Sequence, residues 1–202
     1  MFTGIVEEMG EIKEIKQVSE KAIQMKIQAD IILEDVKVGD SIAVNGVCLT
    51  VTAYDDHAFY VDIMPESYQA TSLASLQQES KVNVERSLRA SDRFGGHFVT
   101  GHVDGTGVIV GVEPKENAVY YEISLSEELL YFMIQKGSVA IDGISLTIFG
   151  VNQKEQTITL SLIPHTMEVT VLGKKTIQDI VNIECDMFAK QVDHFVRHVH
   201  QP

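Results

Sequence analysis

The sequence predicts an all-β protein that contains two copies of one small barrel and ends in a single α-helix. Four short blocks recur in the same order in the two halves of the chain. Between these blocks, apolar and polar residues alternate in short runs, which is typical of strands with one buried face. At the C-terminal end the apolar residues change to the spacing of an amphipathic helix.

The repeat is the strongest of these signals, because a repeated unit predicts the domain organisation of the whole chain. The chain has 202 residues, enough for two domains of roughly 100 residues each. The matching blocks are, in order, MFTGIVEEMGEI (1–12) with FVTGHVDGTGVI (98–109), NGVCLTV (45–51) with DGISLTI (142–148), MPES (64–67) with IPHT (163–166), and VNVE (82–85) with VNIE (181–184). We therefore expect an N-terminal barrel over residues 1–97, a C-terminal barrel over 98–188 and a terminal helix over 189–202.

Strands account for most of each copy. The alternation is clearest in AIQMKIQA (22–29), AFYVDIM (58–64), AVYYEISL (118–125) and QTITLSLI (156–163). About six strands per copy at this spacing favour a small closed barrel over a parallel α/β sheet. A helix is predicted over 126–137, with Ser126 as its N-cap and Gly137 as its C-cap, and a weaker one at the corresponding place, 29–39.

The terminal helix has no counterpart in the first copy. Its apolar residues recur at helical spacing and are Phe188, Val192, Phe195, Val196 and Val199. Such a stripe has to be buried against something. The sequence leaves two possibilities open, the chain's own barrels and the same helix of neighbouring subunits.

Composition restricts the class of protein. The net charge is −13 and no basic residues cluster, so neither nucleic acid nor an anionic membrane surface is an expected partner. Two cysteines are too few for a disulfide framework, and the N-terminus is acidic, so we expect a cytoplasmic protein with reduced thiols. Because the sequence contains no dinucleotide, nucleoside triphosphate or zinc motif, we expect no cofactor and no metal.

Cys48 and Ser145 occupy the same place in the two copies. A lone cysteine in an apolar strand is most often a small buried side chain, and Cys185 fits that description. Serine is a poor choice for a dry core, whereas cysteine and serine are both suited to line a pocket or to act as nucleophiles. The glycine that precedes each of them, Gly46 or Gly143, would allow a ligand to approach the backbone closely.

Two further features suggest chemistry. GGHFVTGHVDGTG (95–107) contains His97 and His102 and reads either as a flexible junction or as the source of an acid or base, for which we favour His102. The two histidines do not complete a metal site. MPES and IPHT place Pro65 and Pro164 where a strand should end, which predicts either an ordinary terminator or an edge whose free backbone groups read a heterocycle.

Taken together, these blocks resemble the riboflavin synthase family of the alpha-chain type, which has two lumazine-binding repeats. The resemblance covers about residues 1 to 190 and rests on MFTGIVEEMG, NGVCLTV, MPES, GGHFVTGHVDGTG, KGSVAIDGISLT, LIPHT and VNIECD. It implies two six-stranded Greek-key β-barrels per chain, a C-terminal helix and a homotrimer. It leaves association with lumazine synthase open.

The activity that the resemblance implies is a dismutation. One 6,7-dimethyl-8-ribityllumazine donates a four-carbon unit to another, which gives riboflavin and 5-amino-6-ribitylaminouracil without a cofactor or metal. Each barrel is expected to bind one lumazine, and the productive pair is expected where the N-terminal barrel of one subunit faces the C-terminal barrel of another. The competing interpretation is a non-catalytic protein that binds lumazine or flavin.

The resemblance also implies the residues of each pocket. The first pocket would contain Thr3, Gly4, Ile5, Val6, Cys48, Leu49, Thr50, Asp62, Ile63, Met64, Pro65, Glu66 and Ser67. The second would contain Gly101, His102, Val103, Lys136, Ser145, Leu146, Thr147, Leu162, Ile163, Pro164, His165, Thr166 and Met167. His165 is a departure, because the family usually has Glu at this position.

The reaction needs a base that removes a proton from the C7 methyl of one lumazine and a nucleophile, or water, that adds to C7 of the other. We expect Ser145, His102 and Thr147 to serve one of these roles and Cys48 to serve the other, with the assignment open. Phe2, Ser41 and Asp186 match residues that the family uses at the site.

Overall fold

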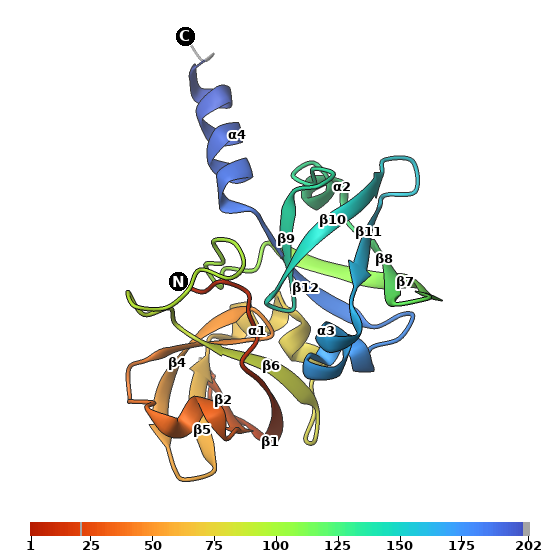
Figure 1. Ribbon diagram of the computed structural model, residues 1–202. Helices are drawn as coiled ribbons and strands as arrows, with labels where there is room; N and C mark the ends of the chain where they lie inside the picture. The colour runs from red at the N-terminus through yellow and green to blue at the C-terminus, as the bar shows by residue number, and fades with distance from the viewer. Residues whose placement is uncertain (21, 200–202) are drawn as a thin grey trace.

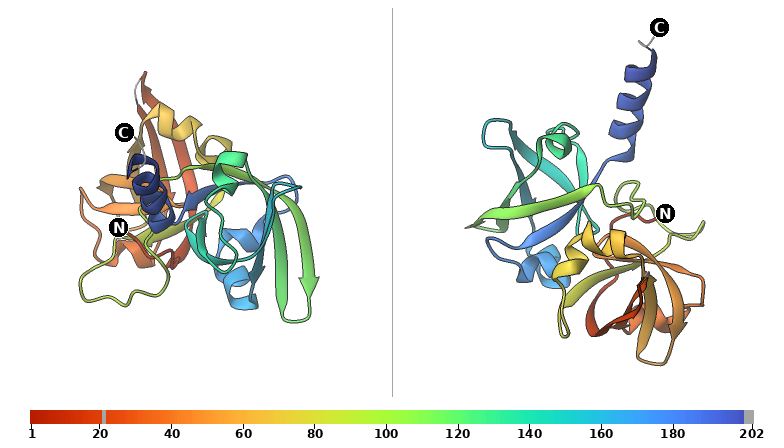
Figure 2. Two further views of the ribbon diagram at one scale, coloured as in Figure 1. Left: turned by 90° about the horizontal axis from the view of Figure 1, so that it is seen from above. Right: turned by 180° about the vertical axis from the view of Figure 1, so that it is seen from behind.

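The computed structural model contains two closed, antiparallel, six-stranded barrels and a C-terminal helix, as predicted (Figure 1). The description covers residues 1–20 and 22–199. The two barrels lie side by side, and the helix extends away from both of them (Figure 2). No helix among the described residues is long and apolar enough to cross a membrane.

The first barrel has the strand order β1-β2-β5-β4-β3-β6, and β6 pairs with β1 to close it. Its strands are β1 (Glu8–Ser19), β2 (Ala22–Gln28), β3 (Ser41–Val44), β4 (Val47–Tyr54), β5 (Ala58–Ile63) and β6 (Lys81–Arg86). Short helical segments interrupt it at η1 (Ile31–Glu34), α1 (Pro65–Gln69) and η2 (Ser72–Ser75). The alternation in 22–29 and 58–64 therefore predicted two real strands.

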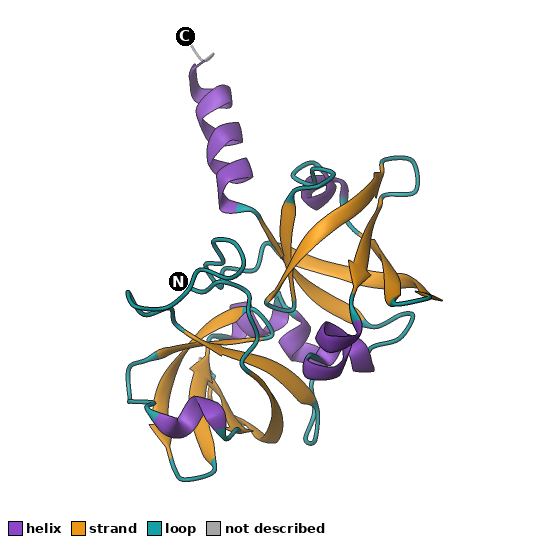
Figure 3. Cartoon of the chain, in the orientation of Figure 1, coloured by secondary structure: helices purple, strands orange, loops and turns teal. Residues whose placement is uncertain are grey.

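The second barrel repeats this order with β7-β8-β11-β10-β9-β12 and closes where β12 pairs with β7. Its strands are β7 (Gly105–Lys115), β8 (Ala118–Ser124), β9 (Ser138–Ile141), β10 (Ile144–Asn152), β11 (Thr157–Leu162) and β12 (Ile180–Cys185). Its helical segments are α2 (Glu127–Leu130), α3 (Pro164–Val169) and η3 (Val171–Lys174), and α4 (Met187–Val199) follows the barrel. The secondary structure at equivalent places is thus the same in both repeats (Figure 3).

The internal helices are shorter than predicted. Ser126 does cap α2 by accepting a hydrogen bond from the Leu129 amide, but the helix ends at Leu130 instead of continuing to 137. The chain must turn into β9, and Lys136 adopts a left-handed conformation there while its amide bonds to the Ile148 carbonyl. At 29–39 only the single turn of η1 forms.

Of the two interpretations of Pro65 and Pro164, the structure confirms the ordinary strand terminator and not the edge or bulge. Each proline begins a short helix, α1 or α3, directly after its strand. At the first position of a helix the missing amide hydrogen has no intrahelical acceptor, so proline costs nothing there. These prolines therefore end the strand and begin a helix, and the reading of a heterocycle by backbone groups at these places stays a prediction.

The two barrels meet at the turns of two equivalent hairpins. Asn45 and Asp142 have positive φ values of 45° and 46°, and the glycines that follow them both have 78°. Paired left-handed residues form the tight turn that suits a twisted hairpin. A Cβ on Gly46 would lie 2.7 Å from the Gly143 amide nitrogen, and one on Gly143 would lie 2.7 Å from that of Gly46. The glycines thus permit contact between the barrels and not, as predicted, the approach of a ligand.

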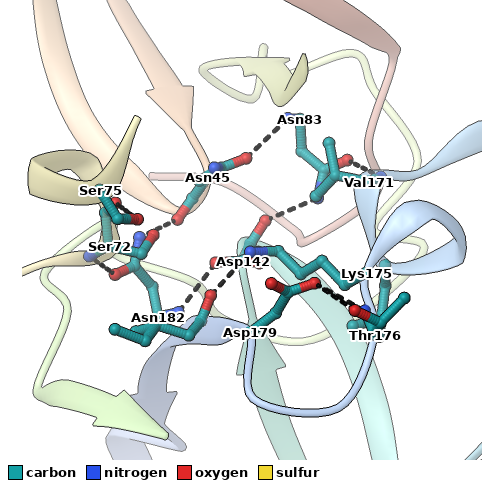
Figure 4. A network of polar contacts seen from close by, with 12 residues as sticks. Asn45, Ser72, Ser75, Asn83, Asp142, Val171, Lys175, Thr176, Asp179 and Asn182 are labelled. Atoms are coloured by element: carbon teal, nitrogen blue, oxygen red, sulfur yellow. Dashed lines mark hydrogen bonds and ion pairs between the residues drawn. The ribbon is translucent and has the colours of Figure 1, made fainter. Parts of the chain in front are cut away.

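Two buried asparagines bond reciprocally across this contact (Figure 4). The side-chain amide of Asn83 in β6 donates to the Asp142 carbonyl at 2.9 Å, and that of Asn182 in β12 donates to the Asn45 carbonyl at 2.8 Å. Each also accepts a backbone amide of the other repeat, from Val171 and Ser72 respectively. Because unmade bonds in a buried place are costly, this network fixes one arrangement of the two barrels.

We expect Gly46→Ala to destabilise the chain more than Gly39→Ala does. Gly39 also has positive φ, at 94°, but a Cβ there would meet nothing within 4 Å. The control should therefore lose about 1–2 kcal/mol from left-handed strain alone, whereas Gly46→Ala should lose about 1–3 kcal/mol more from the clash between barrels. Urea unfolding measures both, and equal losses would show that the close approach does not matter.

Candidate active site

Cys48 and Ser145 lie at equivalent places in the hairpins that contact each other. Cys48 is in β4 and pairs with Ala43, while Ser145 is in β10 and pairs with Ala140. Both side chains are half-buried. Cys48 packs against a small buried apolar cluster to which the fully buried Phe2 belongs.

We call the strand that carries Cys48 the first wall and the strand that carries Ser145 the second wall. Each wall is covered by the segment that precedes the other barrel. The Cys48 amide donates to the Gly101 carbonyl at 2.9 Å, and the Ser145 amide donates to the Gly4 carbonyl at 2.8 Å. A Cβ on Gly101 would lie 2.5 Å from Cys48 Cβ, and one on Gly4 would lie 2.7 Å from Ser145 Cβ. The two glycines, with φ of 81° and 75°, are therefore required for the segments to lie against the walls.

This exchange corrects the predicted grouping of the pockets. Gly4 and Val6 were assigned to the first barrel, but Val6 packs against the core of the second. Val103 was assigned to the second barrel, but it packs against the core of the first. A comparison of repeats cannot reveal this, because the same sequence matches whether a segment stays with its own barrel or crosses to the other.

The segments around Gly4 and Gly101, which cross to the opposite barrel, are called the crossing segments below. Two buried glutamates at equivalent positions accept hydrogen bonds from them. Glu85 accepts the amides of Thr3 and Gly4 at 2.7 and 3.1 Å. Glu184 accepts the amides of Thr100 and Gly101 at 2.6 and 2.9 Å. Both carboxyl groups were missed in the sequence, although the matching blocks VNVE and VNIE place one in each buried strand, where an acid needs partners.

The histidine closest to a wall residue is His97 and not His102. His97 Nδ1 lies 2.6 Å from the Ser145 hydroxyl, and the residue is buried. Burial lowers the pKa of His97, while Asp186 and Glu184 raise it. His102 is exposed, and its backbone amide bonds to the Thr100 hydroxyl.

The stretches that follow β5 and β11 lie beside the same walls. The pairing of Val51 with Val61, continued along the two strands, sets Thr50 beside Asp62. The pairing of Ile148 with Leu160, continued in the same way, sets Thr147 beside Ser161, the residue before the second predicted stretch. The predicted stretches at 62–67 and 162–167 therefore start next to the strands that carry Cys48 and Ser145, and the use of their residues in a pocket stays a prediction.

Three other predicted residues lie on elements that border the walls. Ser41 pairs with Thr50 and lines a hollow of about 240 Å³ beside Arg86. Asp186 accepts the Phe188 amide at 2.8 Å and so caps α4. The Lys136 amine lies 5.3 Å from the centre of the exposed Phe149 ring.

The comparisons with known proteins agree with this geometry. The family model described as "Lumazine binding domain" matches residues 3–87 and again residues 100–186. The riboflavin synthase of Bacillus subtilis (strain 168) is 53% identical over 196 residues, which cover 97% of this chain and 90% of that protein. The chain belongs to the riboflavin synthase family. Its activity is that of a riboflavin synthase, a transferase.

Other members and relatives extend this comparison. The riboflavin synthase of Schizosaccharomyces pombe is 40% identical over 197 residues, covering 97% of this chain and 94% of that one. The solved structure of LumP complexed with riboflavin superposes with a TM-score of 0.83 at 26% identity, covering 92% of this chain and 99% of that one. LumP complexed with 6,7-dimethyl-8-(1'-D-ribityl) lumazine gives 0.81 at 25%, covering 91% and 98%.

In this riboflavin synthase, burial raises the pKa of Glu85 to about 7, although the bonds from Thr3 and Gly4 act in the opposite direction. The folded state therefore holds the Glu85 proton more tightly than the unfolded chain, where the reference pKa is 4.5. The stabilisation from this proton is fully present below pH 4.5 and is lost as the pH rises through 7.

We expect Glu85→Gln to flatten the dependence of unfolding free energy on pH between 4.5 and 7, because glutamine does not titrate. The difference from the parent protein should reach at most about 3 kcal/mol over that window. Urea unfolding at several pH values measures it. Glu113→Gln, at an exposed position, should follow the parent curve, and a Glu85→Gln curve that also follows it would contradict the assignment.

Proposed function

We propose that the chain binds one 6,7-dimethyl-8-ribityllumazine at each wall and transfers a four-carbon unit between two such molecules. The observation that carries this proposal is the pair of equivalent walls, each completed by the crossing segment of the other repeat. One chain then holds two sites of one kind, as a reaction between two molecules of the same compound requires. The products are riboflavin and 5-amino-6-ribitylaminouracil.

The differences between the walls suit the two roles that the substrates play. The first wall presents a thiol at Cys48 where the second presents the Ser145 hydroxyl, and an exposed threonine, Thr50 or Thr147, lies two residues along each strand. One lumazine must lose a proton from its C7 methyl while the other accepts a nucleophile at C7. We assign Ser145, His102 and Thr147 to one role and Cys48 to the other.

Turnover separates this proposal from a carrier that binds lumazine or flavin without chemistry. Purified protein mixed with 6,7-dimethyl-8-ribityllumazine should produce one riboflavin for every two lumazines consumed, followed by the growth of riboflavin absorbance. A chromophore that stays bound and unchanged would support the carrier instead.

We also propose that the productive pair of sites forms between subunits of a homotrimer. Within one chain the crossing segments lie over both walls, and Phe2 pairs with Val99 between them. The support for a partner is α4, whose apolar residues are between 55% and 75% exposed: Phe188, Val192, Phe195, Val196 and Val199. A groove of about 480 Å³ lies between this helix and the turns at residues 131–138. Exposed apolar surface on this scale marks an interface.

We expect a double variant, Val192→Asp with Phe195→Asp, to be monomeric, because two charges in the stripe would be buried without partners. Light scattering should show one third of the parent mass. Turnover should fall at least tenfold while lumazine binding, followed by fluorescence, persists. His194→Asp adds a charge to another side of α4 and should leave mass and turnover unchanged; a double variant of unchanged mass would contradict this use of the helix.

A further inference from the structure

Lys136 has a left-handed backbone conformation at a place where the first repeat has glycine. Its φ is 71°, and that of the equivalent Gly39 is 94°. The two amides donate to equivalent carbonyls, Lys136 to Ile148 at 2.8 Å and Gly39 to Val51 at 2.9 Å. A side chain in this conformation costs free energy, so the lysine is retained against a backbone preference for glycine. The side chain therefore has a use that the first repeat does not share at this place.

The amine of this lysine lies over an aromatic ring. It forms no ion pair with any residue that the structure describes, although acids are in excess in the chain. Its nitrogen is 5.3 Å from the centre of the Phe149 ring, within the range at which a ring face attracts a cation. The ring is 47% exposed, and Tyr120 supports it edge-on with ring centres 5.4 Å apart. The Gln135 side-chain amide also donates to the Phe149 carbonyl at 3.1 Å, which ties the turn to the strand.

The ring lies at the end of the second wall. Ile144 and Ile148 of β10 belong to the core of the barrel, so the alternating residues Ser145, Thr147 and Phe149 point away from it. The pairing of β10 with β11 is irregular directly after Ile148, and irregularities of this kind redirect a side chain. The row that starts at the Ser145 hydroxyl therefore ends at an aromatic ring with a free amine over it.

The equivalent end of the first wall has the opposite hydrogen-bonding character. Thr52 stands where the second wall has Phe149, and its hydroxyl donates back to the sheet at 3.3 Å. Gln24 stands where the second barrel has Tyr120, and its side-chain amide donates to the exposed carboxylate of Asp62 at 3.0 Å. A carboxylate only accepts hydrogen bonds and an ammonium group only donates them. The first wall thus ends at an acceptor and the second at a donor.

We propose that Phe149, supported by Tyr120, is a positioning residue that holds the Lys136 amine where it donates to the ribityl chain of the lumazine at the second wall. This inference rests on the proposed function. A hydroxyl group both donates and accepts, so one polyol chain suits both walls. It donates to Asp62 at the first wall and accepts from Lys136 at the second. The two sites then hold the same chain through hydrogen bonds of opposite direction.

Variants of the full chain at Phe149 test the positioning role. Phe149→Thr, which copies the first repeat, should weaken riboflavin binding about three- to fivefold at one of the two sites per chain, because the amine loses the ring that orders it. Quenching of riboflavin fluorescence measures both sites. The KM for the lumazine should rise by a similar factor while kcat changes less than about twofold. Phe149→Trp keeps an aromatic face and should bind within about twofold of the parent protein.

Lys136→Gly separates a use in binding from a use in folding. It should weaken the same site about tenfold, because a charged donor is lost, and raise the folding equilibrium constant up to about fivefold, because glycine relieves the strain. Glu79→Gly is the matched control, since Glu79 has nearly the same φ, 72°, in the first repeat. It should change folding to the same extent and leave both sites unaffected. Adding Phe149→Thr to Lys136→Gly should cost no further affinity.

A ligand without the chain tests which part of the lumazine the amine contacts. In 6,7,8-trimethyllumazine a methyl group replaces the ribityl chain. Its affinity, measured by competition with riboflavin, should be the same within about twofold in the parent protein, Phe149→Thr and Lys136→Gly. Equal losses for this analogue and for riboflavin would overturn the assignment to the chain. A Phe149→Thr variant that binds riboflavin as tightly as the parent would overturn the positioning role.

A failure of the proposed function would look different from a failure of this inference. If the parent protein binds riboflavin but forms none from the lumazine, the proposed reaction is wrong, and a loss at one site in the two variants still supports the role of Phe149. If the parent turns over and neither variant loses affinity, this inference is wrong and the reaction stands. A parent protein that binds neither ligand would overturn both.

Discussion

The contact between two glycine turns is the constraint on which the rest of the structure depends. Gly46 and Gly143 bring the β3–β4 and β9–β10 hairpins together at their backbones, and Asn83 and Asn182 lock this contact with reciprocal amide bonds. Once the hairpins touch, the strands that carry Cys48 and Ser145 emerge on either side of one centre. The segments that precede each barrel can then cross to the opposite wall.

Because its polar groups are buried, the contact between the barrels is specific for one orientation. Amide groups that cannot reach water must bond to each other, so a shifted or rotated barrel would lose several bonds at once. The same requirement is met at the crossing segments, where the side chains of Glu85 and Glu184 each accept two successive backbone amides. The polar groups between the barrels therefore define an orientation that apolar packing alone would specify less sharply.

The two repeats differ at a few positions that carry reactive or charged side chains. Asp142 replaces Asn45 in the turn, and its second oxygen lies 3.4 Å from the amine of Lys175. The position equivalent to Lys175, at the end of η2, is Leu76, which packs on the first core. Burial raises the pKa of Asp142, although the nearby Lys175 amine acts in the opposite direction. The second repeat therefore contains a polar contact where the first contains an apolar one. The His97 bond to Ser145 is a second difference of this kind.

The sequence by itself determined the repeat, the strands, the terminal helix and the equivalence of Cys48 and Ser145, because alternation and matching blocks are local properties of the chain. The tertiary structure alone decided three things. It set helix α2 to a single turn, since β9 required the chain to reverse. It exchanged the segments around Gly4 and Gly101 between barrels, which identical matches cannot distinguish. It also placed His97, and not His102, against the Ser145 hydroxyl, because the distance from an imidazole to a hydroxyl 48 residues later depends on how the barrels dock and not on any spacing in the sequence.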